Sequence, residues 1–139
     1  TPRATRSPWP FTCEVDYRMP DYGAWSGVAG HVQDIDGNPL PGYYVRTEGA
    51  GLNPPAVRAG ENERFNMIYG IESAWEQAYN PGSYVPLEIR VQLFNYQPEA
   101  NGEYRAVSDT VTVQLGGYAS ASLGYVTCTL NPEWEEDMR

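Results

Sequence analysis

Apolar and polar side chains alternate one residue at a time along residues 87–93. The odd positions are aliphatic and the even positions are polar or charged: Leu87, Ile89, Val91 and Leu93 against Glu88, Arg90 and Gln92. A period of two is typical of a β-strand with one face in a core, because successive side chains point to opposite faces. Residues 87–93 are therefore predicted to form a core strand.

Less regular versions of this alternation recur along the chain, separated by turns rich in Gly, Pro, Asn and Asp. They cover residues 9–17, 27–35, 43–48, 64–71, 104–115 and 118–130. About seven short strands with turns at regular spacing are typical of a sandwich. The predicted fold class is all-β, a single Ig-like or prealbumin-like antiparallel β-sandwich.

Two neighbouring segments in the middle of the chain carry different patterns. In residues 64–71, Phe65, Met67 and Tyr69 share one parity, which predicts a short strand. Residues 71–79, IESAWEQAY, form the one plausible helical turn and are equally compatible with a loop.

The 139 residues are enough for one domain with its own core. Residues 1–10 hold three prolines and no periodicity, which predicts an extended Pro-rich arm or the end of a linker. Residues 11–132 are the predicted sandwich, and residues 133–139 are an acidic tail.

The two cysteines, Cys13 and Cys128, lie near opposite ends of the chain, each on the apolar parity of its predicted strand. In an extracellular protein this arrangement predicts one disulfide that joins the first strand to the last, worth about 4–5 kcal/mol in the chain-entropy model. Two free thiols in a cytosolic protein are the alternative. We favour the disulfide and a secreted or cell-surface protein, as the missing initiator Met suggests a processed chain.

The net charge of -9 narrows the range of partners. All nine basic residues are Arg, so a Lys-Asn isopeptide crosslink is excluded, and an acidic chain is a poor ligand for nucleic acid. No stretch approaches the roughly 20 apolar residues of a membrane helix, so no membrane insertion is expected.

Residues 30–49, GHVQDIDGNPLPGYYVRTEG, resemble the opening hairpin of carboxypeptidase regulatory-like domains, a transthyretin-like (prealbumin-like) β-sandwich family. The matching residues are Gly30, Val32, Asp34, Gly37, Pro39, Leu40, Pro41, Gly42 and Val45. Residues 82–84 look like a later Gly-x-Tyr element, whereas residues 64–66 lack the Asp-Gly turn that precedes the family's middle element. The resemblance implies an accessory module of secreted and surface proteins, with no catalytic residues to carry over.

Catalytic patterns are missing from the sequence. His31 is the only histidine, lies inside a predicted strand and has no nucleophile elbow to accompany it. The acid pairs Glu72 with Glu76 and Glu135 with Glu136 are interpreted as solvated charge. We therefore expect no enzyme and no cofactor.

A D-x-D-x-N spacing at Asp34, Asp36 and Asn38 resembles the start of a calcium loop. The EF-hand template fails because position twelve is Val45, and zinc lacks ligands. A turn-borne calcium site is a weak candidate, and an Asx turn is the favoured interpretation.

Aromatic residues outside the clearest core parities are candidates for a ligand platform. Trp25, Trp75 and Tyr79, with Tyr84 and Tyr96, have the planar side chains that sugar-binding modules use. The favoured interpretation is that they cover the core or a contact with a neighbouring subunit.

These observations lead to two functional hypotheses. The first is a non-catalytic, secreted structural or adhesive module that associates with other copies of itself, or with a surface protein, to form a surface assembly or filament. In it, Trp9, Phe11 and Val15 form an assembly arm that packs on a neighbouring copy. The second is a carbohydrate-binding module of a larger secreted protein, with a glycan as its ligand.

Overall fold

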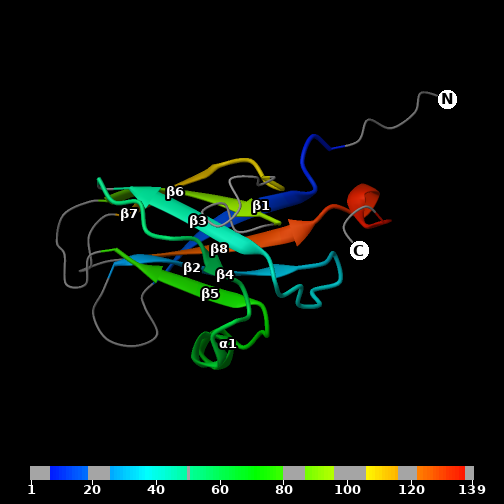
Figure 1. Cartoon of the computed structure of the whole chain (residues 1–139), viewed down its shortest axis with the longest axis horizontal. Helices are drawn as coiled ribbons and strands as arrows, with labels where there is room; N and C mark the ends of the chain where they lie inside the picture. The colour runs from blue at the N-terminus through cyan, green and yellow to red at the C-terminus, as the bar shows by residue number, and fades with distance from the viewer. Residues whose placement is uncertain are drawn as a thin grey trace.

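Two β-sheets stack face to face in the computed structural model (Figure 1), which describes residues 7–18, 26–49, 51–79, 87–95, 106–115 and 122–136. Each sheet has four strands. The all-β sandwich predicted from the alternation is confirmed. The described residues contain eight strands, because residues 57–58 and 74–78 add two strands and residues 63–69, predicted as a strand, are helical.

The first sheet has the strand order β1-β8-β2-β5. Its strands are β1 (Phe11–Arg18), β8 (Leu123–Leu130), β2 (Gly27–Gln33) and β5 (Ala74–Ala78). The last strand of the chain lies between the first two, so β8 is antiparallel to β1 and parallel to β2. This parallel pair departs from the fully antiparallel sandwich predicted from the sequence, because strand order depends on long-range pairing.

The second sheet has the order β4-β3-β6-β7 and is antiparallel throughout. Its strands are β4 (Val57–Arg58), β3 (Tyr44–Gly49), β6 (Leu87–Phe94) and β7 (Val111–Leu115). The prediction for residues 87–93 is confirmed at Ile89, Val91 and Leu93, which are buried between the sheets. Such burial contributes about 1.5–3 kcal/mol per aliphatic side chain.

Residues 63–78 differ from the sequence-based prediction. The predicted strand is helix α1 (Glu63–Tyr69), and the predicted helical turn contains strand β5. The helix starts where Asn62 Oδ1 accepts a hydrogen bond from Arg64 N at 3.0 Å and ends at Gly70, whose φ is 73°. These two caps outweigh a period-two pattern of only three residues.

Strand β5 reaches the sheet because Gly30 leaves space for a large neighbour. Trp75 is opposite Gly30 in the register, and a Cβ on Gly30 would lie 2.9 Å from Trp75 Cζ2 and clash with the Val126 carbonyl oxygen. The indole fills the space that the absent side chain leaves. Trp75 therefore belongs to the core, at the side of the sandwich where β5 is the edge strand.

Both ends of the described chain lie at one pole of the molecule, at the right of Figure 1. Residues 7–10 precede β1, and the short 3-10 helix η1 (Pro132–Trp134) follows β8. Among the described residues, no helix is long and apolar enough to span a membrane. Residues 1–6 of the predicted arm and 137–139 of the predicted tail lie outside the described part of the chain.

Candidate functional site

The two lateral sides of the sandwich are built differently. We call the side formed by β1 and β7 the closed edge, and the side formed by β4 and β5 the open edge. At the closed edge, Phe11 N donates to Val107 O at 2.9 Å and Gln114 N donates to the Tyr17 hydroxyl at 3.0 Å. These bonds join the sheets and satisfy backbone groups that edge strands otherwise expose.

The ends of the described chain hold each other. Asn131 N donates to Pro10 O and Asn131 Nδ2 donates to Trp9 O, both at 2.8 Å. The indole Nε1 of Trp134 donates to Ser7 O at 2.8 Å. Residues 7–10, predicted as part of an extended arm, are therefore packed on the C-terminal segment of their own chain.

The disulfide predicted from the sequence is present between Cys13 and Cys128. The two residues face each other in the β1–β8 register, so the bond crosses adjacent strands of one sheet. A disulfide is typical of proteins that fold in an oxidising, non-cytosolic compartment.

The proposed assembly arm is mostly internal. Phe11 is 1% exposed and belongs to the core, and Val15 is partly buried against the same core. Trp9 remains half-buried beside Asn131. The assignment of Phe11 to a contact with another chain is corrected, since its ring packs edge-on against Tyr43 of its own chain at 5.0 Å between centroids.

The calcium candidate is an Asx turn. Asp34 Oδ1 accepts hydrogen bonds from Asp36 N and Asn38 N, both at 2.9 Å, and Asp34 Oδ2 accepts from Asn38 Nδ2 at 3.1 Å. The hydrogen bond from the Asn38 backbone is the main cause that lowers the pKa of Asp34. Within the described ranges, no group of three or more His, Cys, Asp or Glu residues is placed to hold a metal ion.

Two of the three aromatic residues of the proposed sugar platform, Trp75 and Tyr79, are buried. Trp75 and Tyr79 are 1% and 8% exposed and belong to the core, and the Tyr79 hydroxyl donates to Thr47 Oγ1 at 2.8 Å. Trp25 lies outside the described residues. Trp75 and Tyr79 offer no exposed face on which a sugar ring could stack.

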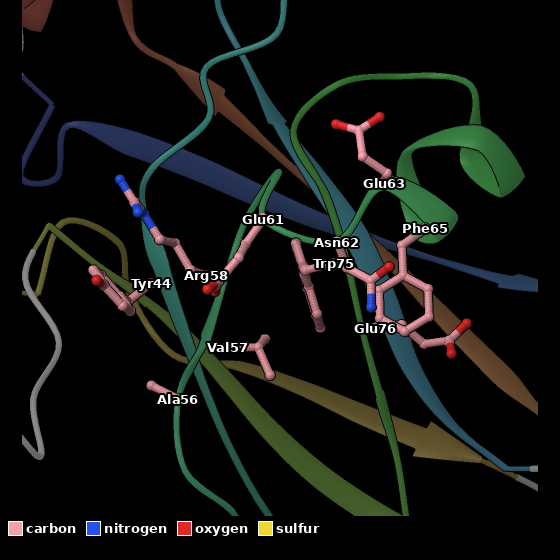
Figure 2. A pocket seen from close by; sticks show the side chains of 10 residues that line it. All are labelled: Tyr44, Ala56, Val57, Arg58, Glu61, Asn62, Glu63, Phe65, Trp75 and Glu76. Carbon is pink, nitrogen blue, oxygen red and sulfur yellow. The ribbon is translucent and has the colours of Figure 1, made fainter.

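A groove of about 680 Å³ lies along the open edge. Figure 2 shows its walls: Tyr44 and Arg58 on one side, Phe65 and Glu76 on the other, with Trp75 between them. The remaining lining residues lie in or just before β4 and at the start of α1: Ala56, Val57, Glu61, Asn62 and Glu63. The groove therefore lies between the edge strands of the two sheets.

Negative charge dominates the groove. Its lining holds three carboxylates, those of Glu61, Glu63 and Glu76, and one guanidinium, that of Arg58. Glu61 and Glu63 are exposed, whereas Glu76 is 9% exposed and its Oε1 accepts from the Tyr69 hydroxyl at 2.6 Å. A positively charged group is the chemistry that such a lining attracts.

Trp75 adds a hydrogen-bond donor to this site. Its indole Nε1 is buried, and no group in the described part of the chain accepts a hydrogen bond from it. Buried N–H groups are paired in most native structures, and each unpaired one costs about 1–3 kcal/mol. A lining residue with an unpaired donor marks a place where a ligand acceptor would be stabilising.

A second polar cluster lies on the outer face of the first sheet. The Tyr125 hydroxyl is 2.5 Å from His31 Nδ1, and His31 Nε2 is 2.9 Å from Gln33 Oε1. Gln33 Nε2 donates to Thr129 Oγ1, which leaves Oε1 as an acceptor and assigns the His31 proton to Nε2. Burial lowers the pKa of His31, and the Arg18 charge acts in the same direction while the Gln33 hydrogen bond opposes it.

This second cluster has the contacts of a structural network. Arg18 Cζ lies 4.1 Å from the centroid of the Tyr125 ring, and the Tyr69 ring packs on Tyr125 at 5.3 Å. In the described part of the chain, no Ser or Cys contacts His31 as a nucleophile would. The arrangement agrees with the interpretation of His31 as a packed strand histidine.

Sequence reasoning missed the groove. The alternation predicts Tyr44 and Phe65 on strands, and the sequence pattern favours solvated charge at Glu76. The available signal was the run Glu61, Asn62, Glu63 next to aromatic residues, but its meaning depends on β5 lying beside β4. No protein-family model matches the chain, and no curated protein matches its sequence.

Proposed function

We propose that this chain is a non-catalytic, secreted binding and assembly module that docks another copy of itself at the open edge of its sandwich. The observation that carries the proposal is the groove between β4 and β5, in which charged side chains and a buried, unpaired indole N–H come together. The resemblance to carboxypeptidase regulatory-like domains, also a proposal, agrees with an accessory role.

The contrast between the two edges supports the location. At the closed edge, backbone groups of β1 and β7 are paired within the chain, and the ends of the described chain hold each other. At the open edge, Ala74 of β5 is paired with Gly60 and Asn66, and the groove lies beside this contact. Edge strands are the usual sites at which one β-protein adds to another. The Cys13–Cys128 disulfide agrees with a module that works outside the cytosol.

Sedimentation velocity of the full chain over a wide concentration range tests this proposal. We expect larger species as the concentration rises, and we expect Ala56→Trp, which fills the groove, to abolish them. Ala78→Trp is the matched control, because Ala78 is exposed at the end of β5 and does not line the groove. A monomer at every concentration contradicts the proposal, and so does equal association of the two variants.

Glycan binding is the second candidate, and one observation favours it. Tyr44 and Phe65 line opposite walls of the groove, with Asn62 and Arg58 beside them. Aromatic rings with polar side chains next to them are suited to binding a sugar. A glycan array tests it with Tyr44→Ala and Phe65→Ala. Trp75→Ala is unsuitable because it removes a core side chain. An array without hits contradicts this candidate.

A further inference from the structure

We propose that the occupant of the groove is residues 1–6 of a second copy, TPRATR, bound as an extended segment. This inference rests on the proposed function and names the part of the partner that binds. It follows from three properties of the groove and one property of the sequence.

The first property is charge. Three carboxylates face one guanidinium in the lining, which is an excess of two negative charges. The Arg58 guanidinium lies 6.0 Å from the centroid of the Tyr44 ring, at one side of the groove in Figure 2. The exposed carboxylates belong to Glu61, which precedes α1, and to Glu63, its first residue. A cationic occupant is therefore favoured over a neutral one.

The second property is the donor on Trp75. Its buried Nε1 has no acceptor in the described part of the chain, so the occupant should bring an oxygen atom. Each residue of an extended peptide brings a carbonyl group, and an arginine side chain brings the positive charge. A neutral glycan supplies oxygen atoms without the charge, so the two properties together favour a peptide.

The third property is shape. The groove runs between β4 and β5, which are the edge strands of the two sheets. An extended segment that lies along an edge strand is a common form of β-sheet recognition. Six residues span about 20 Å when extended, which is close to the length of an ordinary β-strand.

The sequence supplies a matching segment. Residues 1–6 contain Arg3 and Arg6 and no acidic residue, although the whole chain has a net charge of -9. The next residue, Ser7, is held against η1 beside the start of β1, on the closed side of the molecule. The groove is lined by other parts of the chain, β4, β5 and the start of α1, and a second copy is the proposed acceptor.

Charge reversal on both partners tests the inference by light scattering coupled to size-exclusion chromatography. Arg3→Glu with Arg6→Glu removes the positive charges of the segment, and Glu61→Arg with Glu63→Arg removes the negative charges of the groove. We expect each double variant to associate at least roughly tenfold more weakly than the natural chain, as expected when two ion pairs become repulsive. Added salt should weaken association of the natural chain.

Mixing the two double variants gives the sharpest result. In the mixture, the natural arm of one variant meets the natural groove of the other and the two reversed halves also attract, so mixing should restore the association that each variant alone has lost. The chain with all four substitutions should associate again through the reversed charges. The matched control is Glu14→Arg with Glu136→Arg, which makes the same charge change at exposed positions outside the groove.

The outcomes separate this inference from the proposed function. If both double variants associate as strongly as the natural chain, or if their mixture stays monomeric, the inference is overturned and self-association itself is not. A natural chain that is monomeric at all concentrations overturns both. If Arg3→Glu with Arg6→Glu instead changes the elution volume by the same amount at every protein concentration, the segment binds within its own chain. That result also overturns the inference. Because Arg3 and Arg6 precede the described fold, this variant stays informative even if the groove variant fails to fold.

Discussion

The closed and open edges of this sandwich differ in what lies beside their edge strands. Any sheet edge exposes backbone donors and acceptors. At the closed edge, Phe11 N of β1 donates to Val107 O and Gln114 N of β7 donates to the Tyr17 hydroxyl of β1, so one backbone donor of each edge strand is satisfied within the chain. At the open edge, Gly60 N donates to Ala74 O of β5 at 2.9 Å, and β4 and β5 also border a groove lined by side chains of both sheets. The comparison teaches that one fold can use one edge for stability and the other for binding.

The largest effect is expected from the disulfide beside the closed edge. Replacing both Cys13 and Cys128 with Ala should lower the free energy of unfolding by about 4–5 kcal/mol, because the unfolded chain regains the freedom of a long loop. Chemical denaturation with linear extrapolation measures the change. A loss below about 1 kcal/mol would mean that the hydrogen bonds between the chain ends hold the closed edge without the disulfide.

Phe11→Ala tests whether the closed edge is internal. Phe11 is 1% exposed and packs in the core, so the change should cost about 3–5 kcal/mol of stability. Self-association of the fraction that remains folded should not change. If stability hardly changes while association is lost, Phe11 is a contact residue between copies and the assignment of the two edges is wrong.

Removing a single tyrosine hydroxyl at each edge compares their stability with a smaller change. Tyr17→Phe removes the hydroxyl that accepts from Gln114 N, and should cost about 1 kcal/mol at the closed edge. Tyr44→Phe at the open edge keeps the ring that lines the groove and should change stability less. Thermal unfolding of both variants measures the difference, and equal losses would count against the contrast.

The smallest effect is expected from pH, through a residue that belongs to neither edge. Burial lowers the pKa of His31 below its ordinary value of 6.5, so the unfolded chain binds the proton more tightly than the folded chain. Stability should therefore be highest above pH 6.5 and fall as the pH drops below it. Denaturation at several pH values measures this slope, and His31→Gln should reduce it. An unchanged slope would assign the effect to other groups.

The sequence was most informative where local pattern and burial agree. The alternation along residues 87–93 predicts the core strand because every second side chain faces the other sheet. The two cysteines predict their own pairing because no other partner exists in the sequence. Both features depend on the residues themselves.

The helix and the groove depended on information that the pattern lacks. Phe65, Met67 and Tyr69 share a strand-like parity, yet capping by Asn62 and Gly70 makes the segment helical. The groove exists because β5 pairs with β2 while β4 pairs with β3 in the other sheet. Tertiary pairing of this kind joins residues 56–65 to Trp75 and Glu76, and no local pattern reports it.

Hydrogen–deuterium exchange at low and high protein concentration tests the central claim most directly. If partners dock at the open edge, amides of residues 56–63 and 74–78 should exchange more slowly at high concentration, while amides of β1 and β7 should not change. Protection confined to β1 and β7, or protection nowhere in a sample that has associated, would contradict the account.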